Sequence, residues 1–250
     1  MKTILITGAT SGIGLAAAKK LAKSKNQLIL CGRRQRKLDE ISSELSKTSN
    51  ILSLCFDVSE KNEVTKLLDN LPEGFSSIDI LINNAGNAHG MDTIQDGSLE
   101  DWDNMIDSNV KGLLYVSRII IPKMIEKQSG HIINIGSIAG LYPVSSSVYG
   151  GSKGAVHMIN QNLRVELSGT GVRATEICPG RVNTEFFDVA FSDNPDKRKQ
   201  MTSGLKLLEQ EDVADAIMFA INAPWRMNVS MIELTPTEQV PGGSIIKEAK

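Results

Sequence analysis

A glycine-rich turn near the amino terminus constrains the fold of this chain more than any other feature. Residues 7–14 read Thr-Gly-Ala-Thr-Ser-Gly-Ile-Gly, directly after a short apolar run and directly before an amphipathic stretch. Such a turn needs positive φ, and its small residues let a phosphate approach the backbone and the N–H groups of the following helix. No Lys-Ser or Lys-Thr pair follows the glycines, which excludes a P-loop. The sequence therefore predicts a strand, a turn and a helix that bind a pyrophosphate.

Short apolar runs alternate with longer amphipathic stretches along the chain. We expect strands at residues 3–7, 27–31, 51–56, 78–82, 131–135, 172–178 and 230–234. We expect helices at residues 12–24, 35–47, 61–70, 99–127, 147–168 and 210–223. Continuously apolar strands with intervening helices indicate a parallel sheet that is covered on both faces. The predicted fold class is α/β, a Rossmann-type doubly wound, seven-stranded parallel sheet with helices on both faces.

The composition fits one ordinary globular domain. The 250 residues carry a formal net charge of −2, and no linker or repeat divides them, so we expect a single domain over residues 1–250. This near-neutral charge gives no broad basic surface for nucleic acid or for anionic membranes. No apolar run is long enough to cross a bilayer, and the apolar start fits a first strand better than a signal peptide.

The cysteines and histidines are too few and too scattered to form a disulfide framework or a metal site. Cys31, Cys55 and Cys178 lie far apart in apolar runs, so we expect buried thiols and a cytoplasmic protein. The histidines show no ligand spacing, and we expect no metal; they are His89, His131 and His157.

One long connection, residues 185–209, separates the sixth expected strand from the last helix. It follows the carboxyl end of a strand, where open α/β sheets bind ligands. Its Phe186, Phe187 and Phe191 can cover an apolar substrate, and the alternative is a pair of surface helices that contacts no ligand. Residues 236–250 form an irregular tail, which either docks on a neighbouring subunit or frays.

The end of the second strand indicates which nicotinamide cofactor is used. An acidic residue there would bind the ribose 2′-hydroxyl of NAD, but this strand ends Cys31-Gly32-Arg33-Arg34. Guanidinium groups are suited to a 2′-phosphate, and cations are unfavourable at a helix amino terminus without a compensating anion. We therefore expect NADP; the alternative is that both arginines only decorate a solvated helix start.

Tyr149 and Lys153 stand four residues apart at the start of an expected helix, so their side chains share one face. A free tyrosine has a pKa near 10, and a neighbouring ammonium group lowers it toward the range of a general base. Ser137 follows the fifth strand and can hold a substrate oxygen, while Asn109 lies within the long helix at 99–127. A Tyr-x-x-x-Lys pair is common by chance, and the added serine raises its weight.

Together these motifs resemble the short-chain dehydrogenase/reductase family over residues 1–235. The turn has the family's Thr-Gly-x-x-x-Gly-x-Gly spacing, and residues 83–86 resemble its Asn-Asn-Ala-Gly signature. The resemblance implies a catalytic set of Asn109, Ser137, Tyr149 and Lys153, in which the asparagine holds a water of a proton relay. The implied cofactor-binding residues are Gly8, Thr10, Ser11, Gly12, Ile13, Gly14, Arg33, Arg34, Asp57, Val58, Asn83, Ala85, Gly86, Tyr149, Lys153, Pro179, Gly180, Val182 and Thr184.

The resemblance also implies which residues contact the two ends of the cofactor. The resemblance places Asp57 and Val58 beside the adenine, although Asp57 is alternatively the N-cap of the next helix. It places the segment that begins at Pro179 and Gly180 against the nicotinamide carboxamide.

Within the family, the chain is similar to NADP-dependent 3-hydroxy acid (serine) dehydrogenases. The similarity rests on Cys31–Arg34, residues 79–86, 101–102, 131–137 and 179–186. It implies hydride transfer between NADP and a hydroxyl or carbonyl carbon, with Ser137 and Tyr149 at the substrate. Because a hydroxy acid carries a carboxylate, Arg181, which directly follows Pro179 and Gly180, is a candidate to bind it. Arg181 is alternatively directed to solvent or to a phosphate. The other readings are a 3-oxoacyl-carrier-protein reductase, another ketone reductase, or a non-catalytic NADP-binding sensor.

The resemblance also implies a homo-oligomer, a homotetramer or a dimer, formed through the fourth and fifth helices. Gly150, Gly151 and Gly154 permit close packing in this region, although core packing explains them equally well.

Overall fold

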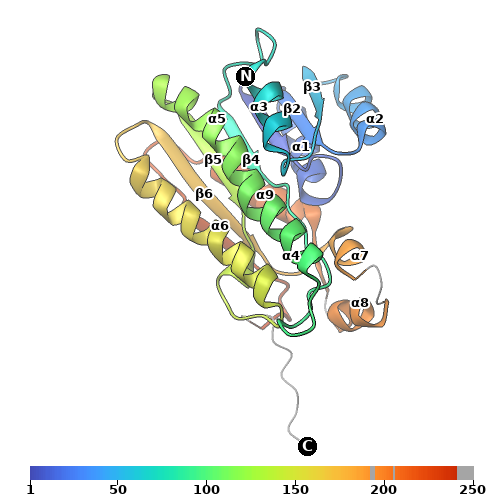
Figure 1. Ribbon diagram of the computed structural model, residues 1–250. Helices are drawn as coiled ribbons and strands as arrows, with labels where there is room; N and C mark the ends of the chain where they lie inside the picture. Colours follow the sequence, from blue (N-terminus) through green and yellow to red (C-terminus); the bar gives the residue numbers. More distant parts are fainter. Residues whose placement is uncertain (192–194, 205, 241–250) are drawn as a thin grey trace, which may run out of the picture.

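The computed structural model describes residues 1–191, 195–204 and 206–240 of the chain, and its centre is one seven-stranded sheet. Every neighbouring pair of strands in this sheet is parallel, which confirms the predicted Rossmann-type fold (Figure 1). The spatial order is β3 (Ile51–Cys55), β2 (Gln27–Gly32), β1 (Thr3–Thr7), β4 (Ile80–Asn83), β5 (Gly130–Ile135), β6 (Val172–Pro179) and β9 (Met231–Leu234).

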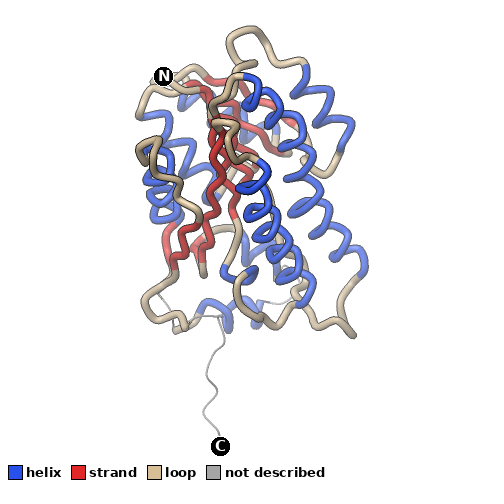
Figure 2. The backbone as a smooth tube through the Cα atoms, turned by 90° about the vertical axis from the view of Figure 1, so that its left-hand side faces the viewer, coloured by secondary structure: helices blue, strands red, loops and turns tan. Residues whose placement is uncertain are grey.

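Helices cover both faces of the sheet, because successive strand residues point to opposite sides and both sides are apolar (Figure 2). Ile4 and Ile6 of β1 pack on one side, and Leu5 packs on the other. The first side is covered by α1 (Gly12–Lys23), α2 (Gln35–Leu45) and α9 (Gln210–Asn222). The second side is covered by α3 (Lys61–Asp69), α5 (Leu113–Glu126) and α6 (Ser147–Glu166).

The strand order reverses between β1 and β4, which lie side by side in the centre of the sheet. At such a switch point the connections leave in opposite directions and open a crevice at the carboxyl ends of the strands. The fold therefore places the glycine turn after β1 beside the turn after β4.

The stretch expected as one helix at 99–127 is divided into three parts. It consists of α4 (Leu99–Ile106), a π-helical segment η1 (Asp107–Gly112) and α5. The π-helical segment contains Asn109, which is 2% exposed and whose side chain bonds to a neighbouring loop. Periodicity alone does not reveal such a segment, because the apolar pattern continues through it.

A chain of buried polar side chains joins two strands and two helices. The Asn83 Nδ2 of β4 donates to Ser117 Oγ of α5 at 3.0 Å and to Asn134 Oδ1 of β5 at 2.9 Å. Asn134 Nδ2 in turn donates to Asn160 Oδ1 of α6 at 3.0 Å. These hydrogen bonds fix the helix that carries Tyr149 against the centre of the sheet.

The described part of the connection after β6, a connection that includes the predicted segment 185–209, forms short helices and strands. It contains β7 (Val182–Asn183), α7 (Phe186–Ala190), α8 (Pro195–Thr202) and β8 (Leu208–Glu209), and β7 pairs with β8. Phe187 and Phe191 are buried, with stacked rings 6.4 Å apart between centroids. The two short helices lie at the carboxyl end of the sheet (Figure 1).

The prediction that all three cysteines are buried is wrong for Cys55. Cys31 and Cys178 are buried, but Cys55 is exposed because it ends β3, the edge strand of the sheet. All three thiols are free. Within the part of the chain that the structure describes, no helix combines the length and the apolar character that a membrane span requires.

Candidate active site

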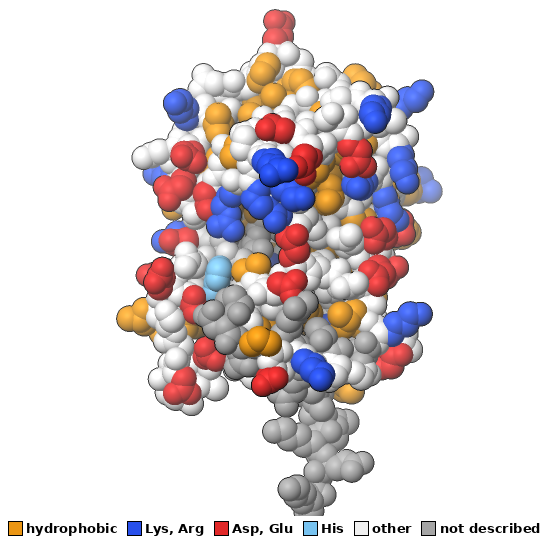
Figure 3. Space-filling model, turned by 90° about the vertical axis from the view of Figure 1, so that its right-hand side faces the viewer, with side chains coloured by type: hydrophobic (Ala, Val, Ile, Leu, Met, Phe, Trp, Pro, Cys, Tyr) orange, Lys and Arg blue, Asp and Glu red, His pale blue; other side chains and the backbone are white. Residues whose placement is uncertain are grey.

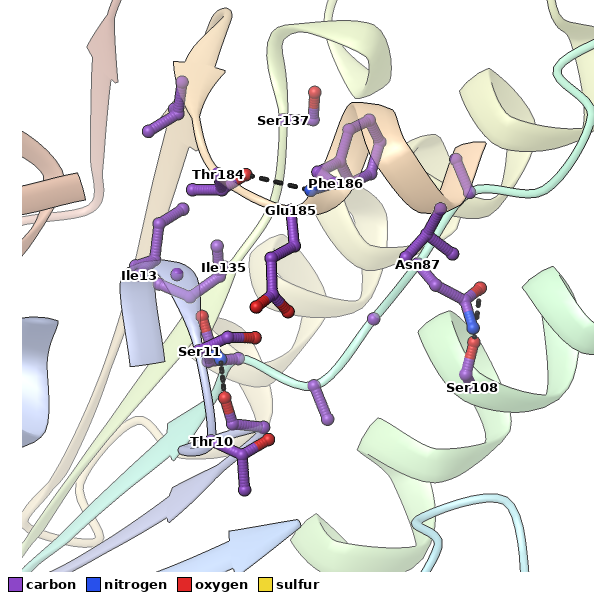
Figure 4. Close-up of a pocket in the computed structure, with 18 of the residues that line it drawn as sticks. Thr10, Ser11, Ile13, Asn87, Ser108, Ile135, Ser137, Thr184, Glu185 and Phe186 are labelled. Carbon is purple, nitrogen blue, oxygen red and sulfur yellow. Dashed lines mark hydrogen bonds between the residues drawn. The ribbon is translucent and has the colours of Figure 1, made fainter. Parts of the chain in front are cut away.

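A cavity of about 360 Å³ opens at the carboxyl ends of the central strands (Figure 4). It extends from the glycine turn and the end of β2 to Tyr149 and Lys153 on α6, and α7 forms another wall. It brings together most of the residues predicted for cofactor and catalysis. These are Gly8, Thr10, Ser11, Gly12, Ile13, Arg33, Arg34, Asp57, Val58, Ala85, Gly86, Ser137, Tyr149, Lys153, Pro179, Gly180, Val182 and Thr184.

The glycine turn has the backbone geometry that the sequence predicts. Gly8 and Gly12 have φ values of 66° and 54°, which side chains disfavour. A Cβ atom on Gly14 would lie 2.4 Å from the carbonyl oxygen of Gly8, so this glycine closes the turn from behind and does not line the cavity. Ser11 is the N-cap of α1 but makes no side-chain capping bond, so it does not compete with a ligand for the first N–H groups of the helix.

Both arginines of the second strand lie at the cavity and contact carboxylates. Arg33 Nη1 lies 3.2 Å from Asp57 Oδ2, and Arg34 Nη1 lies 2.9 Å from Glu185 Oε2. Arg34 also donates to Thr10 Oγ1 through Nε at 3.1 Å and through Nη2 at 3.0 Å. Figure 3 shows the face on which α2 lies, where Lys and Arg side chains gather among Asp and Glu side chains. One end of the cavity thus carries two guanidinium groups, those of Arg33 and Arg34, and each is paired with a carboxylate of the protein.

Asp57 is not the N-cap of α3, because that position belongs to Glu60. Its Oδ1 instead accepts hydrogen bonds from the Ser59 amide at 2.9 Å and from the Ser59 hydroxyl at 2.8 Å. Partial burial acts to raise the pKa of Asp57, but the Ser59 hydrogen bonds and the Arg33 guanidinium outweigh it and lower the pKa. The carboxylate is therefore held charged at the end of β3.

Ser137, Tyr149 and Lys153 meet at the opposite end of the cavity, and each is less than one-tenth exposed. Ser137 follows β5 and begins a 3-10 turn, η2 (Ile138–Gly140), where its Oγ accepts from the Ala139 amide at 3.1 Å. Its hydroxyl also bonds to the Tyr149 side chain. Lys153 Nζ donates to the Ile135 carbonyl at 3.0 Å, which fixes the lysine against the end of β5.

Burial dominates the proton affinities of this group. It raises the pKa of Tyr149 to about 12, although the Ser137 hydrogen bond acts in the opposite direction. Burial likewise lowers the pKa of Lys153 to about 8, against the effect of the Glu176 carboxylate. The expected lowering of the Tyr149 pKa is therefore not found, because burial removes water from the charged form of the tyrosine and outweighs the Ser137 hydrogen bond.

Asn109 lies one layer behind the cavity wall and not on it. Its Oδ1 accepts from the Asn87 amide at 2.8 Å, and its Nδ2 donates to the Asn87 carbonyl at 2.9 Å and to Ser152 Oγ at 3.0 Å. A Cβ atom on Gly86 would lie 2.7 Å from Asn109 Oδ1 and 3.5 Å from Lys153 Nζ. Asn109 therefore holds the loop after β4 directly beside the lysine.

The structure does not bring Arg181 or Asn83 to the cavity. Among the described residues, neither side chain is part of the lining. Asn83 belongs to the buried amide chain, and Arg181 is buried between β6 and β7, where burial lowers its pKa. The Arg181 amide donates to Gln239 Oε1 at 2.9 Å, so the first part of the tail packs back on the chain. The rest of the tail, 241–250, lies outside the described residues.

Several lining residues were not predicted from the sequence. They are Gly32, Phe56, Asn84, Asn87, Ala88, Ser108, Ile135, Gly136, Glu185 and Val189. Ser108 Oγ donates to Asn87 Oδ1 at 3.0 Å, so the π-helical segment supports the loop after β4 (Figure 4). Glu185 carried a usable signal, because a charged residue directly after Thr184 lies at the carboxyl edge of the sheet.

The profile of the short chain dehydrogenase family matches residues 2–195. The chain belongs to this family. This short-chain dehydrogenase is 40% identical to the NADP-dependent 3-hydroxy acid dehydrogenase YdfG of Escherichia coli over 96% of this chain and 97% of that protein. It is 41% identical to sulfoacetaldehyde reductase 2 of Chromohalobacter salexigens over 94% of each. A closed form of serine dehydrogenase complexed with NADP⁺ superposes with a TM-score of 0.91 at 38% identity, covering 99% of this chain and 100% of that one.

Proposed function

We propose that this short-chain dehydrogenase is an NADP-dependent oxidoreductase that acts on the hydroxyl or carbonyl carbon of a 3-hydroxy acid such as serine. The observation that carries the proposal is the joint lining of one cavity by two arginines at one end and by Ser137, Tyr149 and Lys153 at the other. The names of the relatives support the cofactor and the substrate class.

The residues present fit NADP. Gly12 of the turn and Gly32 at the end of β2 line the cavity, and larger residues there would push on its walls, since a Cβ on Gly12 would contact Thr184 Cγ2 at 3.3 Å and one on Gly32 would lie 2.7 Å from Thr10 Cγ2. The start of α1 would hold the pyrophosphate, and Arg33 and Arg34 would hold the 2′-phosphate. Asp57 and Val58 would flank the adenine, and Pro179, Gly180, Val182 and Thr184 would flank the nicotinamide.

When bound, NADP would supply the hydride acceptor or donor, and side chains of the protein would donate or accept the proton of the substrate oxygen. Tyr149 carries a proton at neutral pH, since its pKa lies at about 12, so it is suited to protonate an oxygen that becomes negative during reduction. The Ser137 hydroxyl orients that oxygen. Lys153 is held beside the site by its hydrogen bond to the Ile135 carbonyl, and its ammonium group would stabilise the tyrosinate form that oxidation needs. Asn109 would hold a water of the proton relay through the lysine.

The substrate would lie between this group and α7. Phe186 lies 5.6 Å from Tyr149 between ring centroids, and Phe187 and Val189 line the same wall. We propose that residues 185–209 cover the substrate. A carboxylate-binding role of Arg181 stays a prediction, and it requires a side chain that is now buried to reach the cavity.

We further propose a homo-oligomer, a dimer or a tetramer, working in the cytoplasm. The exposed apolar residues Leu114 and Met158 lie on α5 and α6, through which the family resemblance implies assembly. The free thiols fit a reducing compartment. Light scattering after gel filtration measures the assembly, and a monomer at micromolar concentration would contradict it.

The experiment that tests the activity follows nicotinamide absorbance with NADP⁺ or NAD⁺ and with serine, 3-hydroxybutyrate or a neutral secondary alcohol. We expect turnover with NADP⁺ and a hydroxy acid. Turnover with NAD⁺ alone would refute the cofactor, and preference for neutral ketones in the reverse direction would favour another ketone reductase. NADP⁺ binding without turnover of any substrate would favour a non-catalytic sensor. Sulfoacetaldehyde belongs in the set of reduction substrates, because a relative is named for it.

A further inference from the structure

Glu185 reaches from the start of α7 toward the phosphate-binding turn. Its backbone directly precedes α7, and Figure 4 shows its carboxylate directed into the cavity toward Ser11. Thr184, the preceding residue, lies close to the turn, because a Cβ atom on Gly12 would come within 3.3 Å of its Cγ2. The wall that carries α7 is thus in contact with the wall that is proposed to hold the pyrophosphate.

The carboxylate of Glu185 contacts the same arginine that is proposed to bind the 2′-phosphate. Its Oε2 lies 2.9 Å from Arg34 Nη1, while the other two nitrogens of that guanidinium, Nε and Nη2, donate to Thr10 Oγ1. The Arg34 hydrogen bond is the largest cause that lowers the pKa of Glu185, and a Ser11 hydrogen bond adds to it. The Glu185 carboxylate is therefore charged at neutral pH, and it neutralises the Arg34 guanidinium to which a 2′-phosphate would also bind.

We infer that Glu185 is an internal counterion of Arg34 at the proposed 2′-phosphate site. A 2′-phosphate has to displace the Glu185 carboxylate from Arg34, and Glu185 thereby sets the affinity for NADP. The inference rests on the proposed cofactor. Displacement exchanges one anion for another at the same guanidinium, so part of the attraction that Arg34 offers to NADP is spent on releasing Glu185. A carboxylate left close to a phosphate would add repulsion, so its side chain has to turn away.

The test compares dinucleotide binding by the wild type and by Glu185→Gln, with calorimetry of NADP⁺ and NAD⁺ at low salt. The glutamine keeps the size of the side chain and removes its charge. Since Arg34 and Glu185 are 43% and 57% exposed, we expect Kd for NADP⁺ to fall only about fivefold. We expect Kd for NAD⁺, which lacks the 2′-phosphate, to fall less than about twofold, and 0.5 M NaCl to shrink the difference.

Asp188→Asn is the matched control, because it removes one negative charge from the exposed side of the same helix α7. Its Kd for NADP⁺ should equal that of the wild type at low salt. Equal Kd values for Glu185→Gln and wild type, weaker binding by the glutamine variant, or the same gain in Asp188→Asn would each overturn the inference. Circular dichroism melting confirms that both variants are folded.

These outcomes separate the inference from the proposed function, because the binding measurement is independent of the turnover assay proposed above. Equal Kd values with tight NADP⁺ binding would overturn the counterion and leave the oxidoreductase standing. A tightened Kd in a protein that turns over no hydroxy acid would support the counterion and count against the substrate. Absence of NADP⁺ binding in both proteins would overturn both.

Discussion

Replacing Lys153 by methionine should stabilise this protein while inactivating it. The lysine is 7% exposed, and burial lowers its pKa from 10.5 to about 8. Below pH 8 the folded chain therefore carries a buried charge that the unfolded chain would carry in water. Methionine has a similar length and carries no charge, so the substitution removes this cost without opening a large cavity.

The size of the effect follows from proton linkage. A pKa lowered to about 8 corresponds to a penalty of about 3 kcal/mol at pH 7. The hydrogen bond to Ile135 offsets about 1 kcal/mol, so Lys153→Met should be about 2 kcal/mol more stable at pH 7. Between pH 8 and 10.5 the unfolded lysine binds a proton that the folded one has lost, so wild-type stability rises relative to the variant. By pH 9.5 about 2 kcal/mol of the difference should be gone.

Urea unfolding at pH 7, 8.5 and 9.5 measures this difference, and titrating groups that do not interact with Lys153 cancel between the two proteins. Lys66→Met, on the exposed side of α3, gives the baseline for the same chemical change at the surface. A wild type and a Lys153→Met variant whose stabilities differ by a constant amount over this range would refute the reasoning. The same result would show that the lysine is already charged at no cost.

Three further perturbations test other parts of the structure. Tyr149→Phe should lower kcat about 10²- to 10⁴-fold and leave the Kd of NADP⁺ within about twofold, and a kcat near the wild-type value would remove the tyrosine from the proton step. Gly8→Ala should cost about 1–3 kcal/mol in urea unfolding, because φ is 66° and a Cβ would lie 2.8 Å from Asn84 Nδ2; an unchanged midpoint contradicts this. Asn134→Leu should cost about 1–3 kcal/mol for each buried group left without its partner, and a neutral substitution would mean that water replaces the amide.

The order of the strands along the chain and their bounds could be predicted from the sequence, because continuous apolar runs and helical periodicity are local properties of the chain. The expected strands match the observed ones to within about two residues, as at β4, where 78–82 was expected and Ile80–Asn83 is found. The π-helical segment was not predicted, and the hydrogen bonds of its Asn109 to Asn87 are tertiary contacts that a local pattern does not report. Exposure of Cys55 follows from the place of β3 at the edge, which an apolar run does not encode.

At the site, most of the residues predicted at the carboxyl ends of strands line the cavity, because parallel strands end at one edge of the sheet, but Asn83 at the end of β4 does not. The Arg181 side chain does not line the cavity although its neighbours Gly180 and Val182 do, and the spacing of residues in the sequence does not fix the direction of a side chain beyond the end of a strand. The contact between Arg34 and Glu185 joins residues 151 positions apart, and no local pattern reports such a pair. The raised pKa of Tyr149 depends on burial, which spacing along a helix does not determine.

The buried chain from Ser117 through Asn83 and Asn134 to Asn160 is built only from hydroxyl and amide groups. None of these groups gains or loses a proton in the range in which proteins fold. The buried chain of hydrogen bonds between β4, β5 and α6 therefore does not change with pH, whereas Tyr149 and Lys153 on α6 do titrate. A change of activity with pH then reports the protonation of Tyr149 and Lys153, because pH does not change the protonation of the hydrogen-bonded side chains that hold their helix in place.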